Sequence, residues 1–181
     1  MNIIKNFEDF INESVSVNEA NYNYQPKDKK ELISLLDQLI KERGDDADFN
    51  DIDTSKITDM SELFVGHRKF NGVIDGWDTS NVVDMSYMFS GVRMFNRPLN
   101  NWNTSKVIDM TCMFEDADSF NQPIGDWDVR NVKYMKWMFA NARKFNQNIS
   151  QWDVRNVDYH DGMFDRCPIK EQFMPNLNKM E

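Results

Sequence analysis

A repeat of 25 residues dominates this sequence. Beginning at Phe70, Phe95, Phe120 and Phe145, one pattern recurs without insertion or deletion, and a degenerate unit at Asp51–Phe64 precedes it. A fixed period of this size is typical of chains in which each unit buries its apolar residues against its neighbours. The pattern therefore predicts a stack of five coils, four of them full. The landmarks that keep register are Trp77, Trp102, Trp127, Trp152, Val82, Val107, Val132, Val157, Met88, Met113, Met138 and Met163.

The spacing inside one repeat predicts an α/β repeat with two short elements. We expect a strand around Ile124–Trp127. We expect a helical or 3₁₀ turn at Met135–Ala140, because Met135, Met138 and Phe139 follow an i, i+3, i+4 pattern. Methionine packs well into irregular gaps, so the methionines of the repeat are interpreted as core residues.

The chain divides into four predicted parts, namely a targeting and linker segment (1–26), a capping helix (27–47), the repeats (48–169) and a tail (170–181). The helix is predicted because Asp28 is a suitable N-cap, Gly44 follows the last apolar residue and the leucines between them form one stripe. An apolar stripe on a helix is expected to pack against another apolar surface. Because the open end of the first coil is adjacent, the helix is predicted to cover that end.

The overall charge and residue content argue against several classes of function. The formal net charge is -9, which disfavours a general electrostatic grip on nucleic acid or on an anionic membrane. The sequence has no phosphate-binding glycine loop and no Cys-x-x-Cys pair, and its two histidines lie in packing columns. Cys112 and Cys167 lie in different columns, which suggests free thiols. We therefore predict no enzyme activity, no cofactor and no metal site.

Two columns of polar residues recur with the repeat. The first is asparagine in every full unit, and the second is aspartate or asparagine just after the tryptophan. We interpret the first as a hydrogen-bonded ladder between coils and the second as turn residues, because these side chains bond nearby backbone N–H groups. A line of carboxylates that binds calcium is the weaker interpretation, because Asn103 interrupts it. The columns are Asn71, Asn96, Asn121 and Asn146, and Asp78, Asn103, Asp128 and Asp153.

The first 13 residues have the spacing of a short amphipathic helix, and residues 14–26 read as a linker. The helix could fold back onto the domain or serve as an address tag. With Phe7, Phe10, Ile11 and Glu13, the segment resembles the capsid-targeting peptides of internal head proteins in T-even-type phages. That resemblance implies cleavage by a prohead protease between Glu13 and Ser14. It also implies localisation in the phage head and then in the host cytoplasm. No secretion signal is recognised.

The repeat itself resembles the BspA-like leucine-rich repeat group, in the 25-residue class described as a domain of unknown function in bacterial surface proteins. The stretches that carry the match are FNQPIGDWDVRNV at 120–132, WDTSNVVDMSYMF at 77–89 and DIDTSKITDMSELF at 51–64. The resemblance implies a right-handed leucine-rich-repeat-like solenoid with short parallel strands and a binding role. In the late coils Tyr134 and Tyr159 replace aspartates, and His160 replaces a methionine.

Variable columns of a stack form continuous surface stripes, which makes them candidates for binding. One column contains Tyr87, Cys112 and Trp137, and Lys133, Tyr134 and Lys136 lie close to it. Aromatic residues beside charges are typical of the centre of an interface. Alternatively, Tyr87 and Trp137 fold over the coil edge as packing. Two stacked arginines, Arg130 and Arg155, could grip a carboxylate or remain solvated.

These observations favour a non-enzymatic module that binds a protein partner. The leader suggests a phage protein that is packaged in the head and acts on a host protein. Two alternatives stay open, namely a structural component of the virion and a bacterial BspA-like surface or adhesion protein. The absence of an export signal disfavours the second of these.

Overall fold

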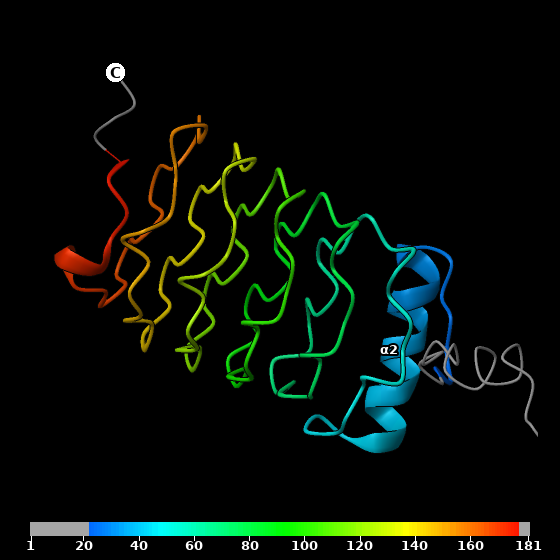
Figure 1. Cartoon of the computed structure of the whole chain (residues 1–181). Coiled ribbons are helices and arrows are strands. Elements are labelled where there is room, and N and C mark those ends of the chain that lie inside the picture. Colours follow the sequence, from blue (N-terminus) through cyan, green and yellow to red (C-terminus); the bar gives the residue numbers. More distant parts are fainter. Residues whose placement is uncertain (1–21, 178–181) are drawn as a thin grey trace, which may run out of the picture.

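The structure, a computed structural model, describes residues 22–177. The chain forms a row of similar irregular loops, one for each 25-residue repeat, with the single labelled helix lying across one end of the row (Figure 1). We call each loop a layer. The first layer is 45–69. The four full repeats are the second to fifth layers, so that the fifth layer is 145–169. The segment after the fifth layer lies at the opposite end from the helix (Figure 1).

The predicted helix is present as α2, Lys29–Arg43. The Asp28 side chain accepts a hydrogen bond from the Glu31 N–H at 2.9 Å, and the Gly44 N–H donates to the Ile40 carbonyl. These two caps set the ends of the helix. The apolar stripe of the helix packs into the core through Leu32, Leu36, Leu39 and Ile40, all of which are buried.

The prediction of an α/β leucine-rich-repeat-like solenoid with short parallel strands is wrong. In residues 22–177 there is one α-helix and no strand, and the six parallel bridges are all isolated. Four of the bridges form one line along the stack, from Asp59–Asp84 to Tyr134–Tyr159. Each bridge stays single because the backbone turns left-handed three residues later, at φ 58° in Tyr87 and φ 52° in Trp137.

Both predicted elements inside the repeat are also wrong. The segment predicted as a strand, Ile124–Trp127, is a tight turn that is closed by the Trp127 N–H donating to the Ile124 carbonyl at 3.2 Å. The segment predicted as a helical turn, Met135–Ala140, is a run of turns. The left-handed φ of Trp137 interrupts the right-handed dihedral angles that a helix requires.

The core is a set of aromatic columns that run through the layers. Successive phenylalanines stack with ring centroids 6.0 Å apart for Phe70–Phe95 and for Phe120–Phe145, and Trp77 lies 6.4 Å from Trp102. Each indole N–H of this buried tryptophan column donates to a carbonyl of the preceding layer, for example Trp127 to Leu99 at 3.0 Å. The polar edge of each buried indole is therefore satisfied, as burial requires.

The asparagine ladder predicted from the sequence is present. The Asn96 side chain accepts a hydrogen bond from the backbone N–H of Asn121 at 2.9 Å, and Asn121 accepts in the same way from Asn146. The second polar column caps turns, since Asp78 accepts from the Ser80 N–H and Asn103 from the Ser105 N–H. Both columns therefore have a structural role in the stack.

The segment after the fifth layer continues the stack for part of one more repeat. Ile169 is buried, and the short 3₁₀ helix η1, Glu171–Phe173, follows it. The Phe173 carbonyl accepts a hydrogen bond from the Ile149 N–H at 2.9 Å, and the Lys170 N–H donates to the Asn146 side chain. This segment thus covers one part of the fifth layer, the part around residues 145–149.

Candidate functional site

Two late layers carry an exposed group of aromatic and charged side chains, which we call the aromatic surface: Tyr134, Lys136, Trp137, Tyr159 and Asp161. The Tyr134 and Tyr159 rings stack with centroids 5.2 Å apart, because these residues occupy the same column one repeat apart. The Lys136 ammonium lies 5.2 Å from the centre of the Tyr159 ring and 2.9 Å from the Asp161 carboxylate. The pair with Lys136 lowers the pKa of Asp161.

The aromatic surface stays accessible although its members contact one another. Tyr134 is 37% exposed, Trp137 44% and Tyr159 46%. Single exposed apolar residues are common on protein surfaces, whereas three large aromatic residues exposed together form a patch of the kind found at interaction sites. The structure therefore brings together Tyr134, Lys136 and Trp137 of the predicted site.

Trp137 is held in this place by its backbone and by a glycine. Its backbone is left-handed, with φ 52°, and its N–H donates to the Asp161 carbonyl at 3.1 Å. The indole lies over Gly162, where a Cβ atom would sit only 2.2 Å from the Trp137 ring. The alternative that Trp137 folds over the edge of its coil is therefore correct in part. The indole packs on the next layer and still exposes almost half of its surface.

The other predicted residues of this stripe lie apart from the aromatic surface or at its border. Tyr87 is two layers away from Trp137, and the side chain between them in the column, Cys112, is buried. A hydrogen bond with the Cys112 thiol raises the pKa of Tyr87. Lys133 has an exposed side chain beside Tyr134, and its carbonyl accepts from the backbone of the next layer.

Arg130 and Arg155 are already engaged within their own turns. Each forms a two-pronged contact with the aspartate two residues before it, at 2.7 Å for Arg130–Asp128 and 2.6 Å for Arg155–Asp153. Arg155 holds the pKa of Asp153 down to about 2. A partner carboxylate that binds Arg130 or Arg155, as predicted, would have to compete with the Asp128 and Asp153 carboxylates.

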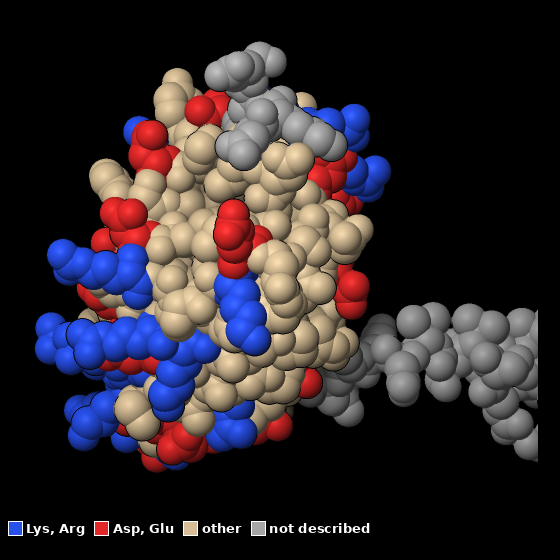
Figure 2. Space-filling model, turned by 90° about the vertical axis from the view of Figure 1, so that its left-hand side faces the viewer, with Lys and Arg blue, Asp and Glu red and all other residues tan. Residues whose placement is uncertain are grey.

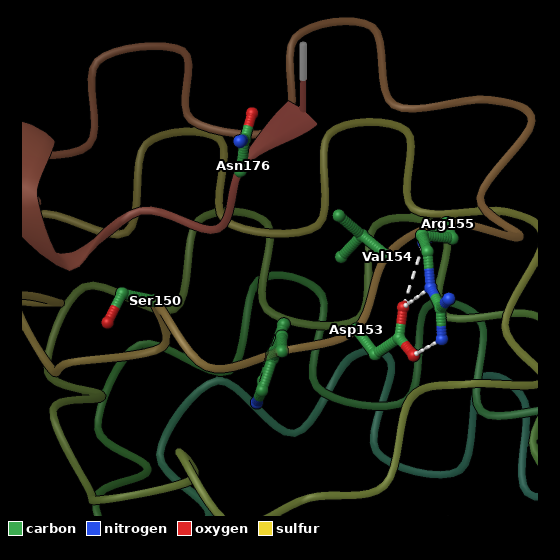
Figure 3. A pocket seen from close by; sticks show the side chains of 6 residues that line it. Ser150, Asp153, Val154, Arg155 and Asn176 are labelled. Atoms are coloured by element: carbon green, nitrogen blue, oxygen red, sulfur yellow. Dashed lines mark hydrogen bonds and ion pairs between the residues drawn. The ribbon is translucent and has the colours of Figure 1, made fainter. Parts of the chain in front are cut away.

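A shallow hollow of about 310 Å³ lies beside Arg155, between the fifth layer and the segment that follows it. Figure 3 shows Asp153 and Arg155 joined to each other at one side of the hollow, with Val154 beside them and Asn176 on the following segment. Ser150 and Trp152 complete the lining. The charged groups of the hollow are thus paired with each other.

The cysteine and histidine side chains that could act in catalysis are instead engaged in packing or in contacts between elements. Burial raises the pKa of the Cys112 thiol to about 12, and burial also raises the pKa of Cys167. Such thiols are poor nucleophiles, because the reactive form is the thiolate. His67 contacts Asp37 of α2 at 2.8 Å and helps to hold the helix on the first layer. No group of three metal-ligating side chains is found in residues 22–177.

Sequence reasoning did not select Tyr159 and Asp161. A signal for both was present, because each stands one repeat after a selected residue, Tyr134 and Lys136 respectively. An aromatic residue repeated in one column predicts a stack. A lysine followed by an aspartate in one column predicts an ion pair between layers.

The predicted cleavage site between Glu13 and Ser14, and the leader around it, lie outside the described residues. In the part that is described, no helix is long and apolar enough to span a membrane. The chain matches the family described as "Mycoplasma protein of unknown function, DUF285" over residues 33–133 and again over 101–180. No curated protein matches the chain, and no solved structure does so. The phage assignment therefore stays a prediction from the sequence of the leader.

Proposed function

Because the chain belongs to the DUF285 family, whose description assigns no activity, we propose a function from the site, namely that the protein is a non-enzymatic module that binds a partner protein through its aromatic surface. The observation that carries this proposal is the cluster of Tyr134, Trp137 and Tyr159, each more than a third exposed. Tyrosine and tryptophan dominate the energetic centres of protein interfaces.

The exposure of Trp137 supports a role beyond stability. A bulky residue in the left-handed region costs roughly 1–2 kcal/mol, and glycine avoids that cost. Gly162 holds the same column position in the next layer, with φ 64°. The left-handed φ also occurs at Cys112 of this column, where the side chain is buried. The support therefore comes from the indole of Trp137, which stays 44% exposed at such a position.

The charges of the aromatic surface suggest the kind of partner. Lys136 and Asp161 neutralise each other, so the surface offers aromatic area with little net charge. A protein partner with an exposed apolar or aromatic centre and a polar rim would suit it. Nucleic acid would suit it poorly, because phosphate binding requires unpaired basic residues.

The test is affinity capture with the purified full-length chain as bait, followed by quantitative mass spectrometry. Tyr134→Ala combined with Trp137→Ala is expected to lower the recovery of the specific partner by about 30-fold, which corresponds to the roughly 2 kcal/mol of an interface hot spot. The matched control is Met94→Ala. Met94 is 56% exposed, and it lies outside the aromatic surface.

The thermal unfolding of each variant is recorded first, so that loss of binding is not confused with loss of folding. A double variant that folds and retains the same proteins as the wild-type chain would contradict the proposal. Equal losses in the Met94→Ala control and in the double variant would contradict it as well.

A further inference from the structure

The layers are joined by a row of main-chain hydrogen bonds that points in one direction. In the fourth layer, the N–H groups of alternate residues donate to carbonyls of the fifth layer. The distances are 2.7 Å for Met135 to Tyr159, 3.1 Å for Trp137 to Asp161, 2.9 Å for Phe139 to Met163 and 2.8 Å for Asn141 to Asp165. Earlier layers repeat the row. Each layer therefore joins the next one by donating this row of main-chain hydrogen bonds to it.

One repeat later, the same row has no acceptor among the described residues. Its N–H groups belong to His160, Gly162, Phe164 and Arg166, and none of them donates to a residue in 22–177. The Asp158 carbonyl holds the place at which each earlier layer accepts a bond, as Lys133 accepts from Asp158 at 2.9 Å. The fifth layer thus presents four donors and one acceptor, which we call the terminal edge.

The terminal edge also has an apolar side chain for a partner to cover. Phe164 stacks on Phe139 with ring centroids 5.9 Å apart, and Phe164 is only partly buried. In the inner layers the corresponding phenylalanines are fully covered, as Phe114 is between Phe89 and Phe139. Figure 2 looks along the stack onto this end, where uncharged residues make up much of the described surface between flanks of charged side chains.

The opposite end of the stack shows what normally covers such a surface. There α2 lies on the first layer, with Leu32 and Leu36 fully buried. Lys29 contacts both Ser61 and Asp59, which stand in the columns of Asp161 and Tyr159, next to the residues of the terminal edge. The segment 168–177 covers a different part of the fifth layer, around Ile149. Within the described residues, 22–177, nothing therefore covers the terminal edge as α2 covers the first layer.

A second copy of the chain is a poor occupant of the terminal edge. Two copies related by a two-fold axis would set four donors against four donors. A head-to-tail arrangement would need the carbonyls of a first layer, and α2 lies over that layer. The suitable occupant is a segment of another protein that presents the carbonyls of alternate residues in one direction, as Tyr159, Asp161, Met163 and Asp165 present theirs to the fourth layer.

We infer that the terminal edge is a docking site for a segment of a partner protein that follows the backbone path of a repeat. Carbonyls of this segment accept from His160, Gly162, Phe164 and Arg166, and one of its apolar side chains covers Phe164. Addition of a segment to an unpaired backbone edge is a general mode of peptide recognition. Main-chain bonds supply affinity in this mode, and side-chain contacts supply specificity.

This inference goes beyond the proposed function, because it uses main-chain atoms of one layer and not the exposed aromatic rings. The two can fail separately. The aromatic surface is tested by side-chain variants and partner capture, whereas the terminal edge is tested with a defined peptide.

The probe is a synthetic peptide of residues 132–142, VKYMKWMFANA. Inside the stack, this segment already presents the carbonyls of Tyr134, Lys136, Met138 and Ala140 to the row of donors in the third layer. Hydrogen exchange of the full chain is followed by NMR with and without the peptide. Saturating peptide is expected to slow exchange of the four terminal-edge amides by about tenfold or more, and to leave the amides of inner layers unchanged.

Two variants sharpen the experiment. Phe164→Asp places a charge where the apolar contact is expected and should weaken peptide binding by about tenfold or more, whereas Phe164→Leu should keep binding within about threefold. A chain that stops at Leu177 should bind the peptide as the full chain does. Slow exchange of the four amides in the free full chain, lost on this truncation, would overturn the inference. Binding of the peptide without protection of the four amides would overturn it too.

Discussion

At the scale of single residues, most of the unusual composition is explained by contacts between equivalent positions of neighbouring repeats. Each tryptophan of the repeat combines a buried ring with one hydrogen bond to the preceding layer, such as Trp152 to the Ile124 carbonyl at 3.0 Å. Trp137 lies in another column and has no such bond. The same residue type therefore serves two purposes, which its column position distinguishes.

Trp127→Phe is expected to lower the free energy of unfolding by about 1–3 kcal/mol, because it removes both the bond to the Leu99 carbonyl and buried volume. Chemical denaturation measures the change. Trp137→Phe is the matched control and should shift stability by about 0.5 kcal/mol or less, since its ring is 44% exposed. Equal losses in the two variants would contradict the distinction between the columns.

The two thiols are expected to react slowly in the folded chain. Burial raises the pKa of Cys112 to about 12 and also raises that of Cys167. A raised pKa leaves the thiol protonated at pH 9, so little thiolate is present to attack iodoacetamide. Mass spectrometry should show Cys167 alkylated before Cys112, which is only 2% exposed, and both alkylated rapidly in denaturant. Rapid labelling of Cys112 in the folded chain at pH 9 would be inconsistent with this packing.

At the scale of elements, the repeat is made of turns joined by bonds between layers. The left-handed residues recur in two columns, one with φ 58° at Tyr87 and 52° at Trp137, and the other with φ 54° at Asp116 and 57° at Asn141. These residues allow the N–H groups of alternate residues to point toward the next layer. The only α-helix in residues 22–177 is α2, and it covers the first layer.

Leu36→Ala in α2 is expected to lower the free energy of unfolding by about 2–5 kcal/mol, because Leu36 is fully buried in the core. Leu35→Ala on the same helix is the matched control, and it should cost less, since Leu35 is only partly buried. Urea denaturation followed by tryptophan fluorescence compares them. If Leu35→Ala cost as much as Leu36→Ala, α2 would not pack on the first layer through the face described.

At the scale of the whole molecule, stability accumulates layer by layer, since each full repeat bonds to the ones beside it. Deletion of residues 95–119 joins Met94 to Phe120 and keeps every column in register. We expect this chain to fold with roughly 1–4 kcal/mol less stability, in proportion to the residues removed. Circular dichroism and thermal unfolding monitor the outcome.

The control deletion removes residues 95–106 only and puts apolar columns opposite polar ones. It should not give a cooperative unfolding transition, because the aromatic and asparagine columns can no longer stack across the junction. Similar unfolding of both deletion variants would contradict a stack that depends on register.

Much of this architecture was predictable from particular residues. The period of 25 residues, the buried Phe, Trp, Val and Met columns, the asparagine ladder and the caps of α2 all follow from local chemistry repeated in register. Of the candidate site, Tyr134, Lys136 and Trp137 were selected because variable columns were expected to form surface stripes, although Cys112 of the same column as Trp137 is buried. Tyr159 and Asp161 were missed, although each stands one repeat after a selected residue, Tyr134 and Lys136 respectively.

The sequence alone was enough to establish that repeats stack and which side chains they bury, because those properties depend on identity and spacing. It could not establish the backbone path inside a repeat. The predicted strand at Ile124–Trp127 and the predicted helical turn at Met135–Ala140 both proved to be turns, because bonds to neighbouring layers outweigh local preference. Which donors remain without an acceptor at the terminal edge, and which aromatic rings remain exposed, likewise became clear only once the layers were placed on one another.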